Sequence, residues 1–542
     1  MSPKHVSPKL LSSLSALALT VCLGCGPAGA ADVDALKQEA VKRVGEMGKL
    51  TQEMVDSIFS FSEPGFEESE TSRYVTQILE KNGFTIERGV AGMPTAWVAK
   101  YGSGKPVIAL GSDVDCLPSM SQKPGVAFRS QLVDGAPGHG EGHNTGIPLQ
   151  VTAAIAVKEI MQREKIPGTL VIWPGIAEEL LAGKAYMVRA GLFKDMDAVL
   201  FAHVAGEMSV QWGQTNSSGL ISMEFSFKGR TAHAASAPWE AQSALDAVEL
   251  MNAGWNFRRE HLRPQQRSHY VITKGGDQPN IVPEAASVWY YLRELDYDRI
   301  IGMKETAIKI ANAAAMMTDT TMTYRTLGSA WPQHMNKPIA EAVAANINAV
   351  GMPSWDEKDQ EMAKAVQVIQ GKKPVGMGDK VTGLVPEATN PSSGGSDDIG
   401  DVAWNVPTVT LRYPANVQNM TNHHWAAAIA VATPIAHKGT TAGAKVMAMS
   451  VLDLLTKPDL VAQARDYFQN VQTKERKYQP LIEEKDQPAV AINRPMMDSY
   501  RAELKKQHYD PSKYATYLEQ LGVRYPTLET KRADAAQPIA RQ

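Results

Sequence analysis

The stretch Val107-Ile108-Ala109-Leu110-Gly111-Ser112-Asp113-Val114-Asp115 is an apolar run of strand length that leads into two acidic residues. Its apolar residues follow one another without the alternation expected of a strand with one solvated face. Continuous runs of this kind are typical of strands that are buried on both faces of an α/β sheet. Residues 169–173, 198–202 and 408–411 repeat the pattern.

Helical patterns separate these runs, and polar residues follow each of them. Residues 146–163 and 182–190 have helical periodicity. In open α/β sheets, binding sites form beyond the carboxyl ends of the strands. The runs therefore predict one site at one edge of the sheet. The candidate residues at that edge are Asp113, Asp115, Glu178, Glu179, His203, His423 and His424.

The segment between the third and fourth runs has a different pattern. Apolar and polar residues alternate over residues 221–228, as in a half-buried strand. The predicted elements that follow are a helix at 241–257, strands near 269–273 and 286–295, a helix at about 298–316 and a strand near 320–324. The order β-α-β-β-α-β is that of a ferredoxin-like unit. We therefore expect a second domain inserted into the first.

The predicted fold class is α/β, with a mostly parallel sheet in the catalytic domain and an inserted ferredoxin-like α+β domain. The catalytic domain is expected in two parts, residues 32–217 and 331–455, on either side of an insert at 218–330. Residues 456–542 are charged, have helical character and contain several prolines. They are predicted to form a helical C-terminal extension.

Residues 1–30 have the features of a secretory signal peptide. Basic residues precede an apolar run at 10–23, and small residues follow at 28–31. Removal of this segment leaves Cys116 as the only cysteine and no transmembrane segment. We expect export to a bacterial periplasm. Lipidation at Cys25 is an alternative, because Cys22-Leu23-Gly24-Cys25 loosely resembles a lipoprotein motif.

Composition narrows the function class. The chain has 542 residues, of which 44% are hydrophobic and 21% charged, as in ordinary soluble proteins. The net charge of −3 lacks the basic surplus of a nucleic-acid-binding protein. No nucleic-acid partner is therefore expected.

The run Gly138-His139-Gly140-Glu141-Gly142-His143-Asn144 combines glycines with metal-ligand residue types. Glycines allow the backbone to crowd around a small ion, while imidazole and carboxylate groups suit zinc, manganese or cobalt. Such a loop is weak support for a metal site when taken alone. It gains weight from the other candidates at the same predicted edge.

Taken in order, the motifs resemble the two-metal amidohydrolases of peptidase family M-twenty. This family includes aminoacylases, carboxypeptidase-G-type enzymes and plant auxin-conjugate hydrolases, and the likeness is to its aminobenzoyl-glutamate-hydrolysing branch. The matching segments are residues 111–118, 139–144, 177–179, 202–204, 229–235 and 279–283, with the distal His423. The resemblance implies a di-metal exopeptidase-like catalytic domain with an inserted dimerisation, or lid, domain.

The resemblance also implies the ligands and the base. Two divalent ions, zinc or manganese with cobalt as a further option, would bridge and acidify a water. The ligands implied are Glu141 as the bridge, His143, Glu179, His203 and His423. Glu178 would be the general base. Without the resemblance, Glu178 and Glu179 could be a solvated helix start, and His203 a buried structural histidine. His423 is chosen over His424 because members of the family place this ligand about two residues before an aromatic residue, which is Trp425 in this sequence.

Further residues are implied outside the ligand set. His233 would reach across a homodimer interface to polarise the scissile carbonyl, with Asn280 as a second donor. Arg293 would bind a carboxylate of a small-molecule amide substrate, and Asp115 would orient a histidine ligand. The plainer alternatives are a turn residue for Asn280, a surface charge for Arg293 and a turn cap for Asp115.

Glu141 departs from the pattern, because this branch of the family usually has cysteine there. An oxygen ligand is harder than a thiolate, so the site is expected to shift toward manganese or cobalt. The expected activity is hydrolysis of an N-acyl or aryl-acyl amino acid. A dipeptidase or aminopeptidase of the same chemistry is one alternative. A damaged site, in an exported binding protein that keeps the fold, is another.

Overall fold

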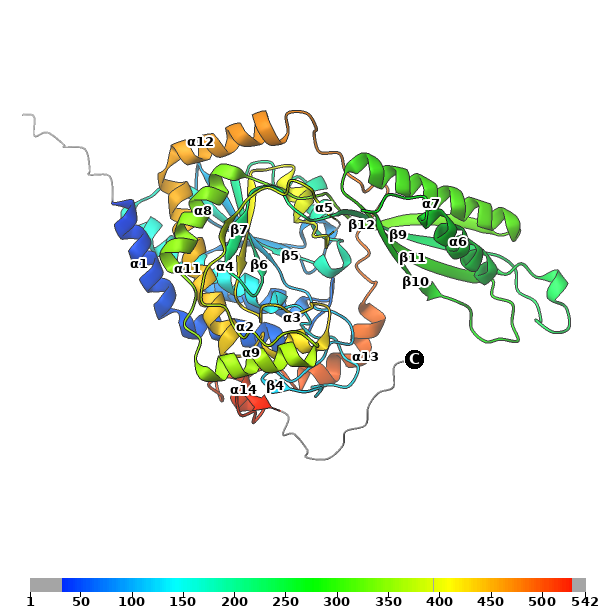
Figure 1. The fold of residues 1–542 in the computed structure, drawn as a ribbon, viewed down its shortest axis with the longest axis horizontal. Helices are drawn as coiled ribbons and strands as arrows, with labels where there is room; N and C mark the ends of the chain where they lie inside the picture. Colours follow the sequence, from blue (N-terminus) through cyan, green and yellow to red (C-terminus); the bar gives the residue numbers. More distant parts are fainter. Residues whose placement is uncertain (1–31, 393, 529–542) are drawn as a thin grey trace, which may run out of the picture.

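The computed structural model describes residues 32–392 and 394–528, and Figure 1 shows a larger body from which a smaller domain projects. The predicted signal peptide, including Cys25, lies outside the described residues. Within the described parts, no helix is both long and apolar enough to cross a membrane.

The larger body is built on an eight-stranded sheet in the order β1-β2-β5-β3-β6-β15-β7-β14. The strands are β1 (Thr85–Arg88), β2 (Trp97–Ser103), β3 (Val107–Asp113), β5 (Gly168–Gly175), β6 (Ala198–Val204), β7 (Ser209–Gln211), β14 (Gly383–Val385) and β15 (Thr408–Tyr413). The predicted continuous runs are β3, β5, β6 and β15, which pair in parallel at the centre. The sheet is mixed, because β1–β2, β2–β5 and β15–β7 pair antiparallel.

Long helices cover this sheet. The element α4 (Gly146–Glu164) packs against β3 and is buried over most of its length. It begins directly after the glycine-spaced loop, so its position fixes that loop beside the sheet. Next to it lies α11 (Pro434–Thr456), and α1 (Val33–Glu46) covers both from outside. The remaining helices of the body are α2 (Gly48–Phe61), α3 (Ser69–Lys81), α5 (Lys184–Arg189), α8 (Lys337–Val350), α9 (Glu357–Ile369) and α10 (Ile399–Ala403).

The projecting domain is the predicted insert. Its elements are β9 (Gly219–Lys228), α6 (Ala244–Arg259), β10 (Arg267–Lys274), β11 (Ala285–Glu294), α7 (Tyr297–Met317) and β12 (Thr321–Ala330). The strands form an antiparallel sheet in the order β10-β11-β9-β12, which is the ferredoxin-like arrangement. Alternate residues such as Phe225 and Tyr290 are buried under α6 and α7. The α/β fold class with an inserted α+β domain is confirmed.

The C-terminal extension is less helical than predicted. It contains α12 (Pro458–Tyr467), a π-helical turn (Phe468–Gln472), α13 (Arg494–Lys505), α14 (Tyr517–Gln520) and β16 (Thr527–Leu528). Residues 473–493 form no helix. This segment contacts the insert, where Glu483 pairs with Lys304 at 2.7 Å and Asp486 accepts a hydrogen bond from the Thr326 amide. Farther on, Tyr525 bonds Asp359 of the larger body.

Candidate metal centre

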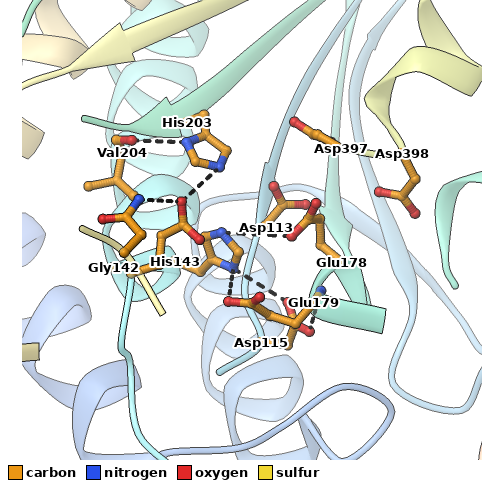
Figure 2. A network of polar contacts seen from close by, with 12 residues as sticks. Asp113, Asp115, Gly142, His143, Glu178, Glu179, His203, Val204, Asp397 and Asp398 are labelled. Atoms are coloured by element: carbon orange, nitrogen blue, oxygen red, sulfur yellow. Dashed lines mark hydrogen bonds and ion pairs between the residues drawn. The ribbon is translucent and has the colours of Figure 1, made fainter. Parts of the chain in front are cut away.

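The candidate ligands lie at the carboxyl ends of the central strands, as Figure 2 shows for most of them. His203 belongs to β6, and Asp113 ends β3. Glu178 and Glu179 form a short 3-10 turn after β5. Glu141 and His143 come from the loop before α4, and His423 follows β15. The sheet therefore brings together residues that are far apart in the sequence.

The backbone at this edge adopts conformations that ordinary residues avoid. Gly142, between Glu141 and His143, has a φ of 127°, and a Cβ there would lie 2.9 Å from Val431. This position requires glycine. Ala177 and His423 are left-handed, with φ of 54° and 55°. Such conformations persist where the surroundings hold them, and they cluster at functional sites.

Glu141 lies between two histidines. Its Oε2 is 3.1 Å from Nε2 of His423, and its Oε1 is 3.7 Å from Nε2 of His203. Asn422 also donates a hydrogen bond to Oε1, at 2.7 Å. The two carboxylate oxygens thus face different imidazoles, which is the arrangement that a bridging ligand needs.

His143 shows that the centre fits a cation. Its Nδ1 lies 3.5 Å from Oδ1 of Asp115 and 3.8 Å from Oε1 of Glu179, and its Nε2 lies 4.0 Å from Oε2 of Glu178. Among the described residues, neither ring nitrogen has a hydrogen-bond partner, although the side chain is buried. Buried polar atoms without partners are costly. Nitrogen and carboxylate groups that converge in this way form the donor set that zinc or manganese accepts.

Asp115 supports the ligands from behind. One carboxylate oxygen faces Nδ1 of His143, and the other accepts a hydrogen bond of 3.0 Å from the backbone amide of Glu179. Asp115 is fully buried. It therefore orients two candidate ligands at once.

The charge balance of the centre also calls for cations. Burial, together with Asp113 and Asp397, raises the pKa of the Glu178 carboxyl well above its usual range. Burial raises the pKa of Glu179 to about 8, although His143 opposes the shift. Carboxylates crowded in a buried site resist ionisation unless positive charge is brought near them. Metal ions in the centre would supply that charge.

Lys184 is a member of the centre that the sequence interpretation missed. Its ammonium is fully buried and contacts Asp398, Asp113 at 2.6 Å and Asp397 at 3.4 Å. The backbone amide of Lys184 donates to Asp398 as well. Lys184 therefore ties the loop at 397–398 to the end of β3. A lone lysine in an apolar segment was the available signal.

Some predicted residues lie elsewhere. His233 and Asn280 are exposed at the far end of the insert, where the backbone of His233 forms an isolated β-bridge with Ile281. Neither residue lines the pocket described in the next paragraph. His139 is buried with Nε2 at 3.2 Å from the Ile58 carbonyl. His424 accepts a hydrogen bond from the Ala426 amide, so of the two neighbouring histidines it is His423 that faces the centre.

A pocket of about 710 Å³ opens over the centre at the junction of the two domains. Glu178, Glu141 and His203 lie on its catalytic side. Arg293 and Tyr291 reach it from β11 of the insert. The Arg293 guanidinium lies 5.1 Å from the Tyr291 ring centre and donates to Ser396. The predicted substrate-binding arginine is thus at the pocket.

Comparison with known proteins identifies the family to which this chain belongs. The profile of the family described as "Peptidase dimerisation domain" matches residues 215–316, which fall largely within the insert. The chain is 33% identical over 443 residues to a p-aminobenzoyl-glutamate hydrolase chain of Escherichia coli, covering 77% of this chain and 92% of that protein. The chain belongs to peptidase family M-twenty. It is therefore a metal-dependent hydrolase with a dimerisation domain.

Other relatives of this M-twenty member agree with that assignment. Xaa-Arg dipeptidase of Mus musculus is 26% identical over 451 residues, covering 82% of this chain and 94% of the relative. An aminobenzoyl-glutamate utilization protein from Klebsiella pneumoniae shares the fold, with a TM-score of 0.52, 15% identity and coverage of 77% and 97%. So does an aminohydrolase from methicillin-resistant Staphylococcus aureus, with a TM-score of 0.54, 19% identity and coverage of 77% and 100%.

Proposed function

We propose that the protein hydrolyses the amide bond of an N-acyl or aryl-acyl amino acid with the help of two divalent cations. The Glu141 carboxylate is the main support for this proposal, because its oxygens face His203 and His423, and all three residues line the pocket. His143 and Glu179 complete the donor set, and Glu178 lies beside it. Two of the relatives are named for the hydrolysis of p-aminobenzoyl-glutamate and of Xaa-Arg dipeptides, which supports substrates of these kinds.

The donor set favours hard or borderline cations. Glu141, His143, Glu179, His203 and His423 would hold them, with oxygen and nitrogen atoms alone. Such a set suits manganese or cobalt, and binds zinc less exclusively than a site containing thiolate. When bound, the cations acidify water and stabilise the negative charge that develops on the amide oxygen.

Glu178 is positioned to move the proton. It lines the pocket, is buried, and makes no ion pair closer than the 4.0 Å approach to His143 among the described residues. In its ionised form it takes a proton from the attacking water and delivers it to the leaving nitrogen. Adjacent Glu179 faces His143 and His423 instead. The two neighbouring acids thus have separate roles.

We propose a homodimer in which the far end of one insert completes the site of the other chain. The dimerisation-domain match supports this assembly. The edge strand β10 leaves Val271 58% and Ile272 42% exposed. Antiparallel pairing of two such edges would satisfy the unpaired backbone groups of β10 and cover part of these side chains. It would also bring His233 and Asn280 of one chain toward the pocket of the other, where they would polarise the scissile carbonyl.

We also propose export to a bacterial periplasm, on the strength of residues 1–30. Expression of the full chain, followed by N-terminal sequencing of the periplasmic protein, checks this. A mature N-terminus near residue 31 or 32 supports cleavage by signal peptidase. A lipid-modified Cys25 would indicate the lipoprotein alternative, and a cytoplasmic full-length chain contradicts export.

The activity is tested with purified protein in two steps. Metal analysis comes first, followed by release assays on N-acyl amino acids, aryl-acyl glutamates and dipeptides, with manganese or zinc added. Turnover of acylated amino acids supports the proposal, whereas turnover of dipeptides alone favours a dipeptidase. Absence of both metal and turnover contradicts it and leaves a binding protein that keeps the fold.

A further inference from the structure

The face of the large sheet that carries His203 continues onto two neighbouring strands. His203 of β6 pairs in register with Arg412 of β15, and Arg412 pairs with Ser209 of β7. Thr410 lies two residues before Arg412. Side chains in register, or two apart on one strand, project from the same face. All of these residues line the pocket.

Thr410 points to a ligand at this place. Its side chain is 8% exposed, and its hydroxyl has no hydrogen-bond partner among residues 32–392 and 394–528. A buried hydroxyl usually finds a partner. Because Thr410 lines the pocket, the missing partner would come from a bound molecule. The hydroxyl can donate a hydrogen bond to an anion.

Arg412 supplies positive charge next to that hydroxyl. In the described parts of the chain, no carboxylate lies within ion-pair distance of its guanidinium; its hydrogen bond goes to Nδ1 of His203, at 3.3 Å. Asp397 contributes to the same pocket, but Lys184 already pairs with it. A guanidinium without a carboxylate partner, facing a pocket, is suited to bind one.

Arg412 and the carbonyl group of Val204 compete for the same nitrogen of His203. Nδ1 of His203 also lies 2.9 Å from the carbonyl oxygen of Val204. One imidazole nitrogen cannot both donate to that carbonyl and accept from a guanidinium. With a cation at Nε2, the proton of the ring would lie on Nδ1 and be donated to Val204. Arg412 would then be without its contact to His203.

We propose that Arg412, with Thr410 and Ser209, forms a second acid-binding subsite, separate from Arg293, for an acidic side chain of the substrate. The inference rests on the proposed amidohydrolase function and narrows its substrate class. The preferred substrate is an N-acyl derivative of a dicarboxylic amino acid, with one carboxylate for each arginine. The insert supplies Arg293 and the catalytic domain supplies Arg412.

The test compares N-benzoyl-glutamate with N-benzoyl-glutamine, which differ by one charge and little in shape. Wild-type enzyme should prefer the acid, and Arg412→Gln should reduce that preference by about ten- to a hundredfold in kcat/KM, the range for a hydrogen bond to a charged group. Arg73→Gln, which removes an exposed guanidinium of α3, is the control and should retain it. An unchanged preference in Arg412→Gln, or no preference in wild type, overturns the subsite.

A binding measurement separates this proposal from the proposed function. Free glutamate should raise the melting temperature of the manganese-loaded protein more than glutamine does. The difference should shrink without metal and vanish in Arg412→Gln. If no amide is cleaved but this pattern holds, the proposed function fails and the subsite stands. Loss of metal from Arg412→Gln would overturn the subsite, because Arg412 would then serve the centre itself.

Discussion

In the metal centre, ionisable side chains from separate segments of one chain face one another; at the far end of the insert, His233 and Asn280 face solvent. The residue types in both regions are common in catalysis, but their surroundings differ. Asp115 and His143 face each other in the interior, and Asn422 donates a hydrogen bond to Glu141. His233 has local contacts to the Ala235 and Ser236 amides. The first region is thus assembled within one chain, while the second acquires a role only against another chain.

The largest effect is expected from replacement of Glu178, the proposed general base of the centre. Replacement of Glu178 by Gln keeps the shape of the side chain and removes the base. The turnover number should fall by about a thousandfold or more, given the usual size of general acid–base catalysis. Metal content should stay the same. Glu284→Gln at the far end is the matched control; an equal loss there would contradict the contrast between the regions.

The second prediction concerns the stability of the centre. Lys184→Met leaves Asp113 and Asp398 buried without their cation, and loss of a partner from a buried pair costs about 3–5 kcal/mol. The melting temperature in thermal unfolding should therefore drop by several degrees or more. Lys274→Met, at the exposed far end of β10, should change it little. A stable Lys184→Met protein would show that the ion pairs do not hold the centre.

The third prediction tests the assignment of the far end to a partner chain. His233→Ala should reduce turnover by about a hundredfold, since a donor to the developing oxyanion is lost, while metal content stays unchanged. His261→Ala, which removes another exposed histidine of the insert, should have little effect.

Mixing of the two variant chains decides whether His233 acts across the dimer. When His233→Ala and Glu178→Gln chains are refolded or exchanged together, half of the dimers are mixed and each holds one intact site. Activity should recover to about a quarter of wild type in an isologous dimer. No recovery in a mixture shown to contain mixed dimers would place His233 in its own chain's site, or in none.

The smallest effect is expected from a change of ligand atom. Glu141→Cys should keep both metal binding and activity but shift the metal preference toward zinc, because thiolate is softer than carboxylate. Competition between zinc and manganese, followed by metal analysis, measures the shift. Glu141→Ala is the severe companion and should lose at least one metal. Full metal content in Glu141→Ala would show that Glu141 does not bridge.

Much of this arrangement could be predicted because its signals are local. Continuous apolar runs indicated the central strands, and alternation over residues 221–228 indicated the first strand of the insert. The candidate ligands came from motifs matched to the family. Lys184 and Asp398 could not be paired in this way, because 214 positions separate them. The same holds for Arg412, whose importance depends on its register with His203 and Ser209.

In the C-terminal extension, by contrast, a local signal was present but predicted the wrong structure for part of the segment. Charged and helical composition predicted helices, yet residues 473–493 run without one because tertiary contacts satisfy their backbone. Arg189 of α5 donates to the carbonyls of Glu483 and Asp486. Trp331 donates to the Gln479 carbonyl. Tertiary contacts of this kind can override the helix propensity of a segment.

That non-helical segment makes the extension a strap across the two domains, as its orange path beside the junction in Figure 1 shows. Arg476 forms an ion pair with Asp298 at the start of α7, and Arg501 forms one with Glu67 of the larger body. Any rotation of the insert has to carry or stretch this strap. The position of the insert over the pocket is therefore stabilised partly by contacts of a segment that places no described side chain in the pocket. Turnover could change through this segment without any alteration of the chemistry.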